Sequence, residues 1–167
     1  MAYRNKIFVS FDGDNDIRYY RLMKAWKQSD YSSFNFHDAH DLNVARDTSS
    51  EQTIKRRLRV RLLNSKIVVS LIGSQTRYLY KFVRWELEQA VVLGLPIIGV
   101  NLNKKRSLDK DRCPPVIRDQ LAIHISFNSK ILQYALQDWP HRHRELKKRG
   151  ESDAYYYTDS VYQELNL

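Results

Sequence analysis

Glu86 occupies an unexpected position for a carboxylate. The stretch 76–94 has the periodicity of an amphipathic helix, with Phe82, Val83 and Ala90 on its apolar side. Glu86 lies within that apolar stripe, four residues after Phe82 and four before Ala90. A carboxylate that faces a core is costly unless it is paired, hydrogen-bonded or protonated. Glu86 is therefore either a structural carboxylate with an internal partner or a poised acid or electrostatic stabiliser in a pocket.

Polar side chains also gather at the end of the first predicted strand. The run KIFVSF is apolar and rich in β-branched and aromatic residues, and acidic residues follow it directly. In an open parallel sheet, ligands bind beyond the carboxyl ends of the strands, where the strand order reverses. The residues expected to border such a site are Ser10, Phe11, Asp12 and Asp14. Ser10 and Asp12 could hold a ribose or a phosphate, and Glu86 would lie at the rim of the same pocket.

Several well-known signatures are absent from the sequence. The chain lacks the G-x-G-x-x-G and Walker A motifs, which excludes the phosphate loops of dinucleotide-dependent redox enzymes and NTPases. A phospho-acceptor response regulator needs an aspartate at the end of its third strand, where this chain has Ile72 and Gly73. The segment 37–41, HDAHD, contains metal-capable groups without a second ligand pair elsewhere. We expect a hydrogen-bonded loop there and no bound metal.

Strands and helices are predicted to alternate along the chain. Apolar runs predict strands at 6–11, 34–36, 66–72, 96–100 and 122–127. Helical patterns occur at 17–28, about 51–64, 76–94, 116–120, 130–139 and 141–148. Pro140 is expected to end the helix before it. The last residues show no clear pattern.

This alternation predicts an α/β fold with a central parallel sheet covered by helices on both faces. We expect a flavodoxin-like three-layer sandwich with five parallel strands in the order 2-1-3-4-5. The 167 residues suffice for one domain with a substantial core. We expect a single domain over 1–167, with a core at about 5–140 and a C-terminal extension at about 141–167.

The composition narrows the environment and the partners. The formal net charge is +9, and much of the excess lies at 55–61 and 142–149. These runs could bind an anion, but no nucleic-acid motif accompanies them, so we expect solvated helix faces and no nucleic-acid partner. No apolar run approaches the ~20 residues of a membrane span, and a signal peptide is not evident. The single cysteine, Cys113, cannot form an internal disulfide, and a cytoplasmic protein is expected.

Three segments of the sequence resemble one known family. They are IFVSFDGDND at 7–16, FHDAHD at 36–41, and IVVSLIGSQT at 67–76 followed by FVRWELEQAVVLGLPIIGVNL at 82–102. Together they are similar to the TIR-like domains of the bacterial Thoeris anti-phage system, in its ThsB branch. The similarity runs from about residue 6 to residue 102. LIGS-x-T followed by R-W-E is its most specific part.

The resemblance implies an enzyme with the flavodoxin-like arrangement. Enzymatic TIR domains cleave NAD at the nicotinamide–ribose bond with a glutamate on the helix after the third strand, which is Glu86 here. The resemblance also implies that the product is a cyclic ADP-ribose isomer that activates a separate effector protein. NAD would be the substrate, and neither a metal nor another cofactor is implied. Many enzymatic TIR domains carry a small residue and a cysteine ahead of this glutamate, whereas this chain has Arg84 and Trp85.

Further site residues follow from placement in such a domain. Asp38 begins the loop after the second strand, which is the mobile loop of TIR assemblies. Phe11, Tyr80 and Trp85 could stack on the substrate or exclude water, although Trp85 could equally pack the helix on the sheet. Activity could depend on self-assembly or on a phage-derived trigger. Two alternatives stay open: a non-catalytic TIR scaffold, and an enzyme like the nucleoside deoxyribosyltransferases.

Overall fold

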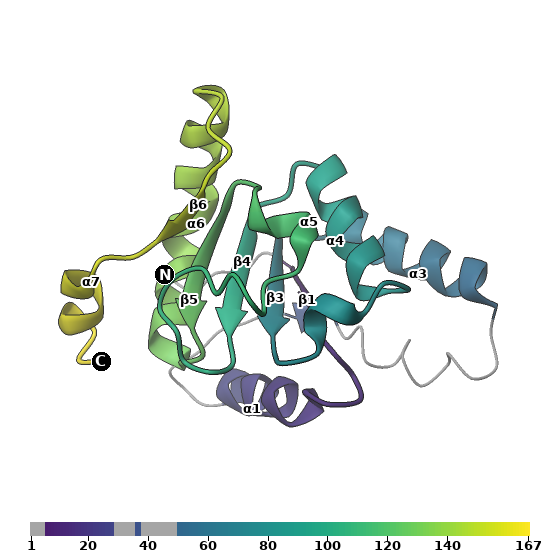
Figure 1. Ribbon diagram of the computed structural model, residues 1–167, viewed down its shortest axis with the longest axis horizontal. Helices are drawn as coiled ribbons and strands as arrows, with labels where there is room; N and C mark the ends of the chain where they lie inside the picture. Colours follow the sequence, from purple (N-terminus) through teal and green to yellow (C-terminus); the bar gives the residue numbers. More distant parts are fainter. Residues whose placement is uncertain (1–5, 29–35, 38–49) are drawn as a thin grey trace.

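The strands of the chain lie side by side in one parallel sheet (Figure 1). The computed structural model describes residues 6–28, 36–37 and 50–167. Within these residues the sheet has six strands in the order β2-β1-β3-β4-β5-β6. They are β1 (Ile7–Ser10), β2 (Phe36–His37), β3 (Ile67–Ile72), β4 (Ile97–Asn101), β5 (Ala122–Ser126) and β6 (Ala154–Tyr156). The predicted order of the first five strands is confirmed, and β6 adds a strand beside β5.

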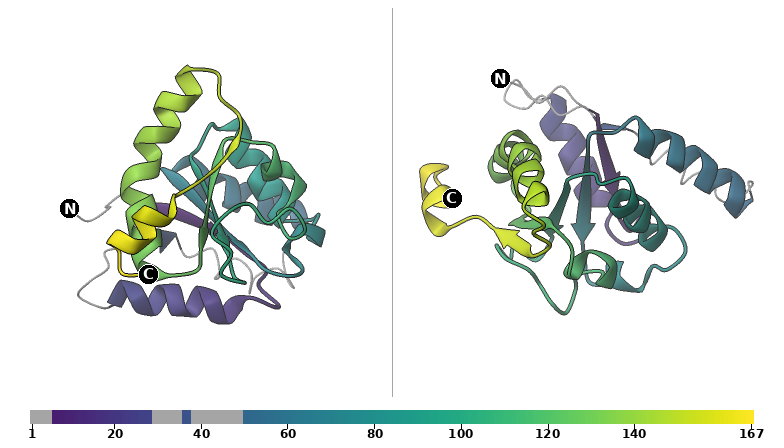
Figure 2. Two further views of the ribbon diagram at one scale, coloured as in Figure 1. Left: turned by 60° about the vertical axis from the view of Figure 1, so that its left-hand side comes forward. Right: turned by 90° about the horizontal axis from the view of Figure 1, so that it is seen from above.

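Helices cover both faces of this sheet (Figure 2). In the described part of the chain the helices are α1 (Ile17–Gln28), α3 (Glu51–Leu63), α4 (Val83–Val92), α5 (Pro115–Arg118), α6 (Ser129–Lys148) and α7 (Asp159–Glu164), with a 3-10 turn η2 (Thr76–Tyr78). One hydrophobic cluster joins α1 and α6 to the sheet, and a second joins α3, α4 and α5 to its other face. The three-layer α/β architecture is therefore the one expected from the alternating pattern.

Strand alternation assigns each side chain of β1 and β3 to one of these faces. Ile7 and Val9 belong to the cluster under α1 and α6, whereas Phe8 belongs to the cluster under α3 and α4. Ser10, two residues after Phe8, therefore faces α4. Phe11 returns to the α1 side and is 3% exposed. The alternation of side chains along β1 thus decides which face of the sheet Ser10 and Phe11 point to.

The single helix predicted over 76–94 is wrong at its start. The chain forms the short turn η2 after β3, continues in an irregular stretch, and enters α4 only at Val83. The hydroxyl of Thr76 accepts a hydrogen bond from the Gly73 amide (2.8 Å) and donates one to the Leu71 carbonyl (3.4 Å). These local bonds turn the chain tightly at the end of β3, and they compete with regular helix formation.

The predicted break at Pro140 is also wrong. Helix α6 runs without interruption through Pro140. Proline removes one helical hydrogen bond. The buried side chains Leu136, Trp139 and His143 lie on either side of it and hold the two halves against the core. Tertiary packing therefore outweighs the local cost of the proline.

The C-terminal residues pack back onto the core. Tyr157 is 4% exposed and its hydroxyl donates to Asp138 at 2.8 Å. Tyr162 of α7 is fully buried, and its hydroxyl accepts a hydrogen bond from the Ser126 amide at 3.3 Å. These tyrosines explain why β6 and α7 form where the sequence shows no clear period. Among the described helices, none is long and apolar enough to cross a membrane.

Candidate functional site

Glu86 is buried and is held by a side chain from the first strand. It lies in the first turn of α4 and is 4% exposed. The hydroxyl of Ser10, at the carboxyl end of β1, donates a hydrogen bond of 2.6 Å to Glu86 Oε2. Ser10 itself is 1% exposed. The structure therefore brings together the two residues that the sequence placed at this edge of the sheet, and it supplies the internal partner that the buried carboxylate requires.

Ser10 is the first member of a polar row that crosses the sheet. The strand register pairs Ser10 with Ser70, Ser70 with Gly99, and Gly99 with His124. Because register partners on parallel strands share a face, all of these residues face the layer of α3, α4 and α5. Ser70 and His124 are fully buried. The row one step earlier on this face, with Phe8, Val68, Ile97 and Ala122, is by contrast apolar.

The row contains polar atoms without partners. In the described part of the chain, Ser70 Oγ and both ring nitrogens of His124 have no hydrogen-bond partner. A Cβ atom at Gly99 would lie 2.6 Å from His124 Nδ1, so the imidazole lies directly against the glycine backbone. Burial lowers the pKa of His124 to about 4, and the ring is neutral at pH 7. Each buried polar group without a partner lowers the free energy of unfolding by about 1–3 kcal/mol, so this row destabilises the core.

Asp12 forms the turn that leads into α1. Its Oδ1 accepts hydrogen bonds from the amides of Asp14 (3.0 Å) and Asn15 (3.2 Å), and its Oδ2 accepts one from Asn15 Nδ2 (2.7 Å). Asp12 is 2% exposed, whereas Asp14 is exposed. The structure thus gives the Asp12 carboxylate a role in shaping this turn, and Asp14 lies at its outer side.

Asp16 is a candidate site residue that the sequence reasoning missed. It directly precedes α1, is 7% exposed, and has no hydrogen-bond partner for Oδ2 among the described residues. This oxygen would lie 2.3 Å from a Cβ atom at Gly73, so only glycine fits there without a shift. Burial, reinforced by the Asp12 carboxylate, raises the pKa of Asp16. A glycine at the end of β3 opposite an acidic turn was the available signal.

Two of the aromatic residues expected near the substrate, Phe11 and Trp85, pack within the fold. The ring of Phe11 stacks on Tyr20 in the core under α1 (centroids 4.6 Å apart), and its contact with the substrate stays a prediction. Trp85 is half-buried, and Lys55 of α3 lies 5.7 Å from its ring centroid. Its role in the structure is therefore packing between α3 and α4. Asp38 and most of the segment 37–41 lie outside the described residues.

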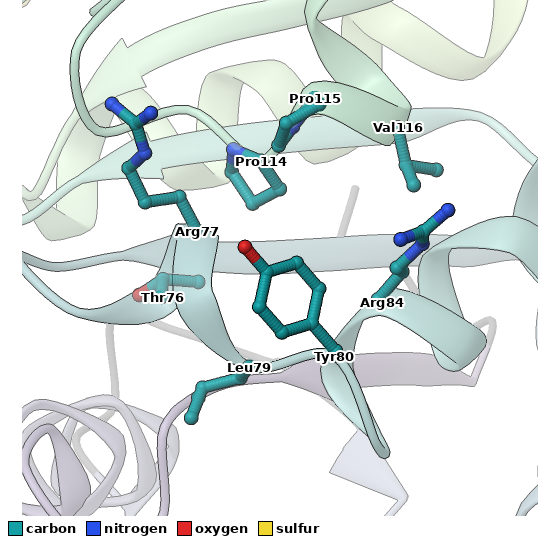
Figure 3. Close-up of a pocket in the computed structure, with 8 residues that line it drawn as sticks. All are labelled: Thr76, Arg77, Leu79, Tyr80, Arg84, Pro114, Pro115 and Val116. Carbon is teal, nitrogen blue, oxygen red and sulfur yellow. The ribbon is translucent and has the colours of Figure 1, made fainter.

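A cavity of about 280 Å³ lies on the other side of the α4 start (Figure 3). Its lining consists of Thr76, Arg77, Leu79, Tyr80, Arg84, Pro114, Pro115 and Val116. Tyr80 is 63% exposed and forms one wall, as suits an aromatic residue available to a ligand. Neither Glu86 nor any of residues 10–14 is part of this lining, so this cavity is a different one from the pocket expected at the end of β1.

The chain matches the model of one known protein family. The family described as "Thoeris protein ThsB, TIR-like domain" matches residues 8–107, which is more than half of the chain. The match spans β1 to β4 and includes Ser10, Asp16, Gly73 and Glu86. The buried Ser10–Glu86 pair at the carboxyl edge of the sheet thus lies within the matched region. The chain therefore belongs to the family of TIR-like domains of the Thoeris protein ThsB.

Proposed function

We propose that this protein cleaves the nicotinamide–ribose bond of NAD and forms a cyclic ADP-ribose isomer in anti-phage defence. The family supports the defence role, and one observation supports the catalytic role. That observation is the carboxylate of Glu86, buried at the edge of the sheet and held by the hydroxyl of Ser10. A structural carboxylate at a surface helix would more simply be exposed.

The chemistry suits a single well-placed carboxylate. Cleavage of the bond to a cationic nicotinamide develops oxocarbenium character at the ribose, and a carboxylate stabilises this charge or holds the ribose hydroxyls. Because nicotinamide leaves as a neutral molecule, the step needs no general acid. The surroundings of Glu86 exclude bulk water, which strengthens its interaction with a developing positive charge. Ser10 would orient the carboxylate by engaging one of its oxygens.

Cyclisation makes a further demand on the site. The ribosyl intermediate must meet a nucleophile of the same molecule before it meets water, which requires a folded substrate and a closed pocket. The diffusible product would then activate a separate effector. Self-assembly or a phage-derived trigger would complete the active state.

The test is the release of nicotinamide from NAD, with product analysis by mass and chromatography. The purified chain is incubated with NAD, alone and with lysate from phage-infected cells. Glu86→Gln is expected to abolish turnover. Glu145→Gln is the control, because Glu145 is exposed on α6, pairs with Lys148 at 3.8 Å, and lies away from both Glu86 and the cavity lining. Turnover that survives Glu86→Gln would overturn the catalytic assignment.

A second function is favoured by the same hydrogen bond. If the Ser10–Glu86 pair only fastens α4 to the sheet, the domain would be a non-catalytic TIR scaffold that recruits partners through its surface. In that case Glu86→Gln would lower thermal stability and abolish partner recruitment, while no NAD would be consumed under any condition. The two candidates are therefore separated by turnover in the wild-type protein.

A further inference from the structure

The proposed chemistry at Glu86 does not involve the residues that line the cavity beside α4. It lies between the irregular stretch that follows η2 and the start of α5. Glu86 points into the sheet from α4, whereas Arg84, two residues earlier, is exposed and lines the cavity. The cavity and the Glu86 carboxylate are therefore on different sides of the same helical turn.

The walls of the cavity are apolar and flat. Leu79 and Tyr80 lie on one side, and Pro114, Pro115 and Val116 lie on the other, with Thr76 at the base (Figure 3). An aromatic ring and proline rings are surfaces on which a planar heteroaromatic group can stack. The volume of about 280 Å³ is close to the lower limit of small-molecule sites. It suits one nucleotide better than a dinucleotide.

Two guanidinium groups flank these walls (Figure 3). Arg77 lies with its guanidinium carbon 5.1 Å from the Tyr78 ring centroid, and its Nη1 donates to the carbonyl oxygen of Asp111. Arg84 is held through its Nε by Glu88 at 2.8 Å. Each of these contacts fixes the arginine side chain through one N–H group of its guanidinium. Among the described residues, other N–H groups of each guanidinium can donate to an anion. Arginine donors of this kind bind phosphate in a bidentate way.

We propose that this cavity binds a nucleoside 5′-phosphate. The base would stack between Tyr80 and the proline wall, and the phosphate would lie at the end of the cavity that Arg84 flanks, with Arg77 at the opposite end (Figure 3). The choice of an adenine nucleotide rests on the proposed function, because the substrate NAD contains an adenylate half. The ligand could be that half of NAD or a separate nucleotide, and both present the same base and phosphate.

A nucleotide bound here would act on the segment that leads to Glu86. The hydroxyl of Thr76, which lines the cavity, accepts a hydrogen bond from the amide of Gly73 at the end of β3. The carboxylate of Asp16 lies against Gly73. Arg84 belongs to the same turn of α4 as Glu86. Occupancy would therefore stiffen the stretch between η2 and α4.

Binding of 5′-AMP to the full chain tests the proposal by calorimetry, because AMP has no nicotinamide bond to cleave. Arg84→Ala and Tyr80→Ala are each expected to weaken AMP binding by about tenfold or more, as for a lost charge-assisted hydrogen bond or stacking contact. Adenosine and inorganic phosphate are expected to bind more weakly than AMP. Arg57→Ala is the matched control, because this exposed arginine lies on α3 away from the cavity lining.

The arms of the experiment separate the sources of the ligand. Competition of NAD with AMP in the Glu86→Gln protein would identify the adenylate half of the substrate, and AMP binding without competition would identify a separate nucleotide. Either result supports the cavity. Absence of AMP binding, or equal weakening by Arg57→Ala, overturns it, and Arg84→Lys guards against a folding defect. A failure of NAD cleavage alone would overturn the proposed function and leave the AMP result standing.

Discussion

The hydroxyl of Ser10 donates a 2.6 Å hydrogen bond to Oε2 of Glu86, joining the first strand to α4 across 76 positions of the chain. Both side chains are almost completely buried. This bond gives the anomalous carboxylate of α4 a defined orientation at the carboxyl edge of the sheet. The same bond fastens α4 to β1 and orients the carboxylate in the proposed chemistry. Its removal is therefore expected to change both the stability of the protein and its NAD turnover.

Ser10→Ala is expected to lower both stability and turnover. Loss of the donor leaves a buried carboxylate oxygen less satisfied, which costs about 1–3 kcal/mol in the free energy of unfolding. Misorientation of Glu86 would reduce NAD turnover by about tenfold or more, because small displacements of a catalytic group are costly. Denaturant unfolding and nicotinamide release measure the two effects. Ser160→Ala, at an exposed serine, is the control, and unchanged stability in Ser10→Ala would contradict the bond.

Ser70→Ala is expected to leave stability unchanged or to raise it by about 1 kcal/mol. The hydroxyl of Ser70 is fully buried and lacks a hydrogen-bond partner in the described part of the chain, so its removal relieves a desolvation cost. Urea unfolding compares the variant with the wild type. A loss of more than about 1 kcal/mol would mean that the hydroxyl has a partner in solution.

Stability is expected to fall as the pH is lowered from about 6.5 to about 4. Burial lowers the pKa of His124 to about 4 from its ordinary 6.5, and burial with the nearby Lys147 does the same for His143. Between these values the unfolded chain binds more protons than the folded chain, so the free energy of unfolding rises with pH in this window. For the fully buried His124, the free energy of unfolding falls by up to about 3 kcal/mol as the pH is lowered across this window.

Unfolding measured at a series of pH values checks this expectation. His124→Leu is expected to reduce the slope between pH 4 and 6.5, since the variant removes a buried imidazole whose pKa is lowered. His141→Leu is the control, because His141 is exposed. An unchanged slope in His124→Leu would show that the ring is not buried and neutral.

Gly73→Ala is expected to destabilise the protein by about 1–3 kcal/mol, as for other overpacked positions. A Cβ atom at this position would lie 2.3 Å from Asp16 Oδ2, too close for any real contact. Because the clash is with one side chain, the double variant Gly73→Ala with Asp16→Ala should recover most of the loss. A double-mutant cycle measures this coupling. Additive effects would show that Asp16 does not lie against Gly73.

The fold followed largely from patterns that act locally. The strands β1, β3, β4 and β5 and the helix α3 were predicted because buried elements repeat their apolar side chains at fixed periods. The predictions went wrong where local signals conflicted with distant contacts. Pro140 should end a helix, but buried Trp139 and His143 keep α6 whole. The C-terminal tyrosines Tyr157 and Tyr162 are placed by hydrogen bonds to Asp138 and Ser126, which the local sequence pattern does not show.

The sequence by itself determined that Glu86 lies in an apolar stripe and that acidic residues follow the first strand, because these facts concern spacing alone. Only the tertiary structure decided what each side chain meets. The pleat turned Ser10 toward Glu86 and Phe11 into the opposite core, and the approach of the β1 turn to the end of β3 placed Asp16 against Gly73. The Ser10–Glu86 and Asp16–Gly73 pairs join residues more than 50 positions apart, and such pairings depend on how strands are ordered rather than on any local period.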